Sequence, residues 1–120
     1  MYLVAMLAVF ASAKIVDNVI DYVEIEFPAR TYRINNITFV FSDKVPSNCA
    51  NSTASGCAYT WNKTVYMVNH SYIGWNGVLG LCNHELCHIH ISESEEICNN
   101  FPNIFSECNE LINIIKSEIR

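Results

Sequence analysis

The chain has 120 residues and a net charge of −5 at neutral pH, and 51% of its residues are hydrophobic. This length suits one domain with a single hydrophobic core and is too short for two domains. The acidic balance, without any cluster of basic residues, argues against a nucleic-acid partner. We therefore expect one small domain that does not bind nucleic acid.

The first 13 residues, Met1 to Ala13, are almost entirely apolar and end in Ala11-Ser12-Ala13, a pattern that signal peptidases cleave. A membrane-spanning helix needs about 20 residues, so this segment is short for a span. We predict a cleaved signal peptide over residues 1–13 and a single domain over residues 14–120. An uncleaved membrane anchor and an ordinary buried helix are the alternatives.

The segment that follows is predicted to contain one helix and two strand pairs. Apolar residues at helical spacing predict a helix over about residues 14–25. Two β-rich runs, residues 31–34 and 37–41, predict a hairpin around a pair of asparagines. After a polar loop, residues 58–61 and 65–68 predict a second hairpin.

Residues 84–88 read His84-Glu85-Leu86-Cys87-His88, which is an H-E-x-x-H motif within a run of apolar residues at helical spacing. Positions four apart share one face of a helix, so both imidazoles can bind one metal ion. Glu85 would project beside that metal, where its carboxylate can take a proton from a bound water whose pKa zinc lowers to about 7. Cys87 points away from the histidine face and suits a disulfide. The motif therefore predicts a hydrolytic zinc site.

The motif helix is expected to run through Ile91. Ser92 and Ser94 are candidate N-caps of a short helix that begins at Glu95 or Glu96. A last helix, beginning near position 106 and apolar along one side, is expected to close the domain.

Six cysteines follow the predicted cleavage site, at positions 49, 57, 82, 87, 98 and 108. An even number of cysteines in a small domain is typical of disulfide-bonded proteins from an oxidising compartment. Cys49 and Cys57 flank a polar loop and can staple it, and the other four would then tie the motif helix to the segment that follows it. Metal binding by cysteines is the alternative, although none forms a C-x-x-C pair. Four Asn-X-Ser/Thr sequons, at positions 36, 51, 62 and 69, also favour a secreted glycoprotein.

The segment from Ile37 to Ile104 resembles a minimal zincin, the fold of the HExxH zinc peptidases. The resemblance implies an α+β fold in which a small, twisted, mostly antiparallel sheet precedes the active-site helix and one or two helices close the domain. It also implies a peptide or protein substrate that pairs with an edge strand, a position that the order of elements gives to Val65–Val68. Only the pentapeptide is specific to the family, because this order of strands suits many small α+β domains.

A catalytic zinc site usually has three protein ligands, so one ligand must lie outside the motif. The metzincin continuation would need a glycine at position 91 and a histidine at position 94, and Ile91 and Ser94 exclude it. The gluzincin pattern takes a glutamate from the next helix, although its gap is usually longer than the one available here. Glu96 is our first choice, because it shares a helical face with apolar residues and has a polar residue one turn later. Glu107 and Glu93 are the alternatives.

Two further histidines lie close to the motif in the sequence. His90 is two positions after His88, which places it on the opposite side of a helix from the metal. His70 and Tyr72 precede the motif helix and could polarise a substrate carbonyl, but ordinary loop positions are the more frequent use of such residues.

These features predict a secreted zinc metallopeptidase in which His84, His88 and Glu96 bind zinc and Glu85 activates water. The alternative belongs to another class: a non-catalytic, disulfide-rich binding domain with structural zinc or none. A fourth protein ligand, such as His90 or a cysteine, would mark a structural site.

Overall fold

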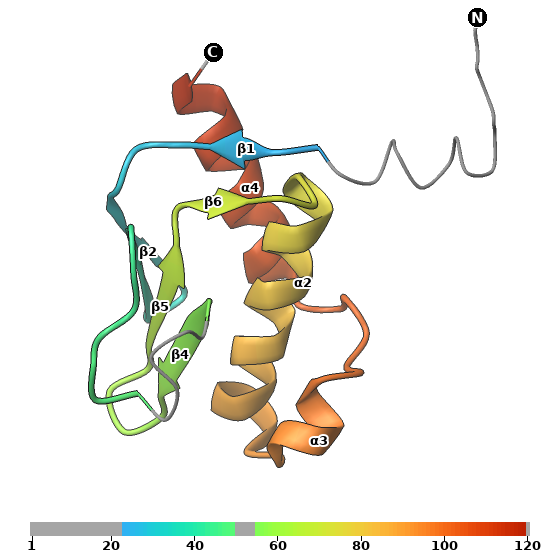
Figure 1. Cartoon of the computed structure of the whole chain (residues 1–120). Helices are drawn as coiled ribbons and strands as arrows, with labels where there is room; N and C mark the ends of the chain where they lie inside the picture. The colour runs from blue at the N-terminus through green and yellow to red at the C-terminus, as the bar shows by residue number, and fades with distance from the viewer. Residues whose placement is uncertain (1–22, 50–54, 120) are drawn as a thin grey trace, which may run out of the picture.

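The computed structural model describes residues 23–49 and 55–119, which form a sheet layer and a helix layer (Figure 1). This is the α+β class predicted from the sequence. The elements are β1 (Ile25–Glu26), β2 (Thr31–Ile34), β3 (Ile37–Ser42), β4 (Gly56–Tyr59), β5 (Thr64–Val68), β6 (His70–Ser71), α2 (Trp75–Leu86), the π-helical turn η1 (Cys87–Ile91), α3 (Glu95–Cys98) and α4 (Ser106–Ile119).

The described chain begins with a strand rather than with the end of a helix. The predicted signal peptide and residues 14–22 of the predicted helix lie outside the described residues. Ile25 and Glu26 form β1, which pairs antiparallel with β6, so the prediction of helix as far as residue 25 is wrong. The half-buried Ile25, the exposed Glu26 and the buried Phe27 alternate with the period of a strand, which the helical spacing of the preceding residues concealed.

Both predicted hairpins are present, and they form one four-stranded sheet of order β2-β3-β5-β4. In the first, Asn35 and Asn36 have φ of 51° and 69°, the left-handed pair that a two-residue hairpin turn needs. In the second, β4 pairs antiparallel with β5, while β5 pairs parallel with β3. β5 is therefore an interior strand, and the prediction that Val65–Val68 forms the edge is wrong. The edge strand that lies against the motif helix is β4.

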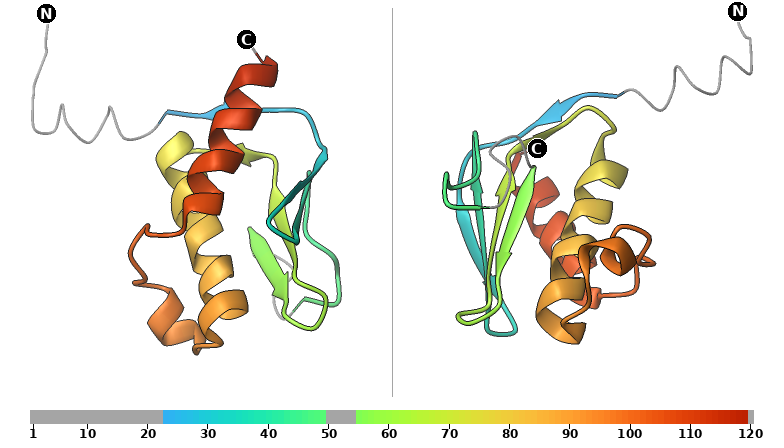
Figure 2. Two further views of the ribbon diagram at one scale, coloured as in Figure 1. Left: turned by 180° about the vertical axis from the view of Figure 1, so that it is seen from behind. Right: turned by 60° about the horizontal axis from the view of Figure 1, so that its bottom comes forward.

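The core lies between the sheet and two helices that cover one of its faces. α2 packs over β4 and β5, and α4 packs beside α2 and against β2 (Figure 2). Alternate residues of β3 point into this core, namely Ile37, Phe39 and Phe41. The helices contribute Val78, Cys82 and Leu86 from α2, and Leu111, Ile112 and Ile115 from α4. Both of these stripes were predicted from their helical spacing.

Three disulfides join parts of this structure, and no cysteine of the described chain is free. The pairs are Cys49–Cys57, Cys82–Cys108 and Cys87–Cys98. The first staples the loop before β4, as predicted, while the other two tie the motif helix and its continuation to α4 and α3. These bonds favour an extracellular or other oxidising compartment. Within the described ranges, no helix combines the length and the hydropathy that crossing a membrane requires.

Candidate metal centre

The motif helix presents two histidines and a glutamate at one place on its surface. His84 and His88 lie one turn apart, with their ring centroids separated by 5.1 Å. His84, Glu85 and His88 each offer an atom that can bind a metal, and these atoms all lie within 4.8 Å of one another. The group could therefore hold a metal ion, as the motif predicts.

One buried amide fixes the motif helix relative to the chain that follows it. Asn83 has no exposed surface. Its Nδ2 donates to the carbonyl of Leu79 at 2.9 Å, and its Oδ1 accepts from the backbone N–H of Phe105, also at 2.9 Å. A buried side-chain amide of this kind is stable only when such partners are present. Asn83 therefore attaches the segment between α3 and α4 to α2, at the residue before His84.

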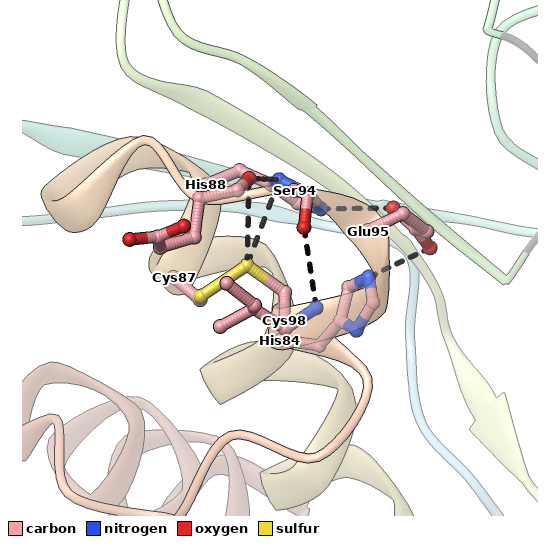
Figure 3. A network of polar contacts seen from close by, with 8 residues as sticks. His84, Cys87, His88, Ser94, Glu95 and Cys98 are labelled. Carbon is pink, nitrogen blue, oxygen red and sulfur yellow. Dashed lines mark hydrogen bonds and ion pairs between the residues drawn. A yellow bond between two sulfur atoms is a disulfide. The ribbon is translucent and has the colours of Figure 1, made fainter.

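The carboxylate that reaches both imidazoles belongs to Glu95, the first residue of α3 (Figure 3). Its Oε2 lies 3.1 Å from Nε2 of His84, and its Oε1 lies 3.0 Å from Nε2 of His88. The predicted residue, Glu96, is the next one along α3 and is exposed. α3 turns Cys98 inward, and Glu95 is three positions before Cys98, on the same side of the helix. That spacing was the signal in the sequence that could have favoured Glu95.

A tight reversal returns the chain to the motif seven residues after His88. α2 continues into η1, and Ser92 then adopts a left-handed conformation with φ of 60°. Ser94 is the N-cap of α3, as predicted, and its Oγ accepts a hydrogen bond from the N–H of Ile97 at 3.4 Å. The segment between His88 and α3, although short for a gluzincin, is therefore long enough to bring the first residue of α3 back to the motif.

The hydrogen bonds of His88 decide which of its ring nitrogens carries the proton. Its Nδ1 lies 3.0 Å from the carbonyl oxygen of Glu93, and a carbonyl oxygen only accepts, so Nδ1 carries the proton. In the neutral ring, Nε2 then has a lone pair, and it faces a carboxylate oxygen of Glu95 at 3.0 Å. The lone pairs of this nitrogen and of the carboxylate oxygen repel each other at this distance unless a proton or a metal cation lies between them. An Nδ1–H bound to a carbonyl is also how metal-binding histidines are usually oriented.

Glu85 is buried beside the edge strand, with 5% of its surface exposed. Burial, and then the negative charge of Glu95, raise the pKa of Glu85 from 4.5 to about 7. Gly56 of β4 leaves room for this carboxylate, because a Cβ at position 56 would lie 2.7 Å from Oε2 of Glu85 and 2.9 Å from Cδ1 of Leu81. Gly56 is therefore part of the site, and nothing in the sequence marked it.

His84, Glu85 and Glu95 line a cleft of about 660 Å³ between the sheet and α2. His70 and Tyr72, the two candidates for polarising a substrate carbonyl, also line this cleft. The chain that carries them approaches α2 at Gly77, which is seven residues before His84, or about 10 Å along the helix axis. They therefore lie toward the far end of the cleft rather than beside the motif.

The remaining candidate ligands have other partners. Nε2 of His90 lies 3.2 Å from Oε2 of Glu107, so these two residues pair with each other. Glu93 is the exception, because the atom that contacts His88 is its backbone carbonyl oxygen and not its carboxylate. The six cysteines are all in disulfides. The fourth ligands that would mark a structural zinc site are thus otherwise engaged.

Comparison of the chain with protein-family models, with curated proteins and with solved structures finds no match. The case for a function therefore depends on the geometry of these residues.

Proposed function

We propose that the protein is a secreted zinc metallopeptidase of the zincin type. In this proposal His84, His88 and Glu95 are the zinc ligands, and Glu85 is the general base. One observation carries it: a single carboxylate contacts both imidazoles of an H-E-x-x-H motif, next to a second, buried carboxylate in the wall of a cleft. The three disulfides support an extracellular setting.

The donor set fits zinc in composition. Two imidazole nitrogens and one carboxylate oxygen are the ligands of a common class of catalytic zinc site. Ligands placed about 2.0–2.1 Å from a tetrahedral ion lie about 3.3 Å from one another. The two oxygens of Glu95 lie 3.1 and 3.0 Å from the nitrogens of His84 and His88, one oxygen to each ring, so one of these oxygens would have to move between the rings to share an ion with both. The hydrogen bond from Nδ1 of His88 to Glu93 leaves Nε2 available as a ligand.

The chemistry then follows from the position of Glu85. A bound zinc ion would supply a Lewis acid that polarises the scissile carbonyl and makes water nucleophilic at neutral pH. Glu85 takes one proton from the attacking water on its carboxylate and passes it to the nitrogen of the leaving amine. The peptide C–N bond breaks, and the products are a carboxylic acid and an amine.

The edge strand β4 is the proposed binding site for an extended peptide. Gly56, the first residue of β4, packs against Glu85, so a peptide paired with this edge would pass the general base. This assignment replaces the earlier one to Val65–Val68, because those residues are paired on both sides.

Zinc analysis and three glutamine variants test the proposal. The purified protein should contain stoichiometric zinc and hydrolyse unstructured peptides, and a chelator should abolish the hydrolysis. Glu85→Gln should keep zinc and lose at least about 100-fold in hydrolysis, the usual contribution of a general base. Glu95→Gln should weaken zinc binding. Glu96→Gln makes the same change of charge one residue along, at an exposed position, and should retain both properties.

Three results would overturn the proposal. A wild-type protein without bound zinc would remove the metal site altogether. A Glu85→Gln variant with full hydrolytic activity would remove the mechanism, and zinc binding without any hydrolysis would favour the non-catalytic binding domain.

A further inference from the structure

The helix that carries Glu95 has a single buried residue. α3 contains four residues, which is too few for a helix to be stable without tertiary contacts. Cys98 is the one residue of α3 that is buried. The side chain of Glu95 is 69% exposed, and Ile97 is 48% exposed. Cys98 is therefore the one buried side chain that attaches α3 to the rest of the protein.

Cys98 is bonded to a residue of the motif itself. Its partner, Cys87, lies between Leu86 and His88, so the disulfide joins the motif to the turn of α3 that follows Glu95 (Figure 3). The Sγ of Cys98 also lies 3.7 Å from Nδ1 of His88. One covalent bond thus contacts one imidazole and fixes the helix whose carboxylate faces that imidazole.

We propose that the Cys87–Cys98 disulfide positions Glu95 for metal binding. This inference rests on the proposed function, because it takes Glu95 to be a metal ligand. Without the disulfide, Glu95 would belong to a segment that has to be ordered each time the metal binds, and the entropy lost on ordering lowers the affinity. The disulfide is therefore a positioning element of the site as well as a contribution to stability.

The Cys82–Cys108 disulfide provides a matched control. It joins α2 to α4 across 26 residues, whereas Cys87–Cys98 spans 11. Because a longer closed loop removes more entropy from the unfolded chain, loss of Cys82–Cys108 should destabilise the protein more. It does not hold α3, so its loss should change metal affinity less. Loss of Cys82–Cys108 should thus have the larger effect on stability, and loss of Cys87–Cys98 the larger effect on metal affinity.

The test uses the full chain with the variants C87A/C98A and C82A/C108A. Zinc affinity is measured by competition with a chromophoric chelator, and stability by denaturant unfolding of the zinc-free proteins. C87A/C98A should bind zinc about 10- to 100-fold more weakly, the range found when groups that orient metal ligands are lost. C82A/C108A should bind zinc nearly as well as wild type despite its larger loss of stability. Equal affinities of wild type and C87A/C98A would overturn this inference and leave the zinc site standing, whereas wild type without zinc would refute the proposed function instead.

A double-mutant cycle shows whether the disulfide acts through Glu95. In a Glu95→Gln background, C87A/C98A should weaken zinc binding little further, because the ligand that the disulfide positions is already lost. Independent, additive losses would overturn the inference. If C87A/C98A does not fold, Ser94→Ala loosens the same helix from its other end by removing the N-cap, and it enters the same cycle with the same expected result.

Discussion

Gly56→Ala should displace Glu85 and lower activity without removing the metal. Among the described glycines, positive φ is confined to Gly74, so the cost at Gly56 comes from lack of space rather than from the backbone. The new methyl group would lie 2.7 Å from Oε2 of Glu85 and 2.9 Å from Cδ1 of Leu81. Overpacking of this kind costs about 1–3 kcal/mol of folding free energy. The carboxylate ends a flexible side chain and should yield first, and a shift of about 1 Å in a reacting group lowers the rate about 100-fold.

The assay separates this effect from general destabilisation. Urea unfolding of zinc-free wild type, Gly56→Ala, Glu85→Ala and the double variant gives a coupling free energy. Because Glu85→Ala removes the carboxylate that the methyl group meets, Gly56→Ala should cost less in that background, by about 1 kcal/mol. Zinc affinity of Gly56→Ala should stay near that of wild type while hydrolysis falls. An equal cost in both backgrounds, or full activity of Gly56→Ala, would refute the reasoning.

Three further outcomes are expected. In the zinc-free protein, the folded-state pKa of Glu85 is raised from 4.5 to about 7, so its contribution to stability is fully present below pH 4.5 and is lost as the pH rises through 7; urea unfolding of Glu85→Gln should lack this decline. Asn83→Ala leaves the partly buried N–H of Phe105 without its acceptor and should cost about 1–3 kcal/mol in denaturant unfolding, and a neutral effect would contradict the role of this amide. In a eukaryotic secretory host, peptide mass spectrometry should find glycans at Asn36 and Asn62, which are exposed in turns, and not at Asn69, whose side-chain nitrogen donates to a backbone carbonyl.

Features that depend on neighbouring residues could be predicted from the sequence. The spacing of His84 and His88 placed both imidazoles on one helical face. The pair Asn35-Asn36 predicted a hairpin turn, because asparagine tolerates the left-handed conformation better than most residues. Ser94 predicted the start of α3, where it caps the helix. In each case the physical cause lies within one turn of the residue.

The carboxylate that faces both imidazoles could not be predicted in the same way. The apolar spacing of Ile97 and Phe101 indicated an inward face that carries Glu96. In the structure Ile97 is 48% exposed, and the buried residue of α3 is Cys98, which is bonded to Cys87. Six cysteines allow fifteen pairings, so the sequence does not reveal which bond turns Glu95 toward the motif.

The edge strand was missed because its position depends on a non-local pairing. The turn between β4 and β5 predicts only that these strands are antiparallel neighbours. Whether β3 pairs with β4 or with β5 is decided by burial on the helix-covered face, where Val65 and Met67 are almost fully enclosed. Both residues suit an interior strand, a preference that the order of elements alone does not express.

A zinc ligand that depends on a disulfide would make maturation follow a fixed order. In a newly made chain in a reducing cytosol the cysteines remain thiols, so α3 would lack its covalent attachment. Glu95 would then not be held beside the two histidines. Oxidation would then place the carboxylate beside the histidines, and the redox environment in which the chain folds would set the affinity of the proposed site for metal.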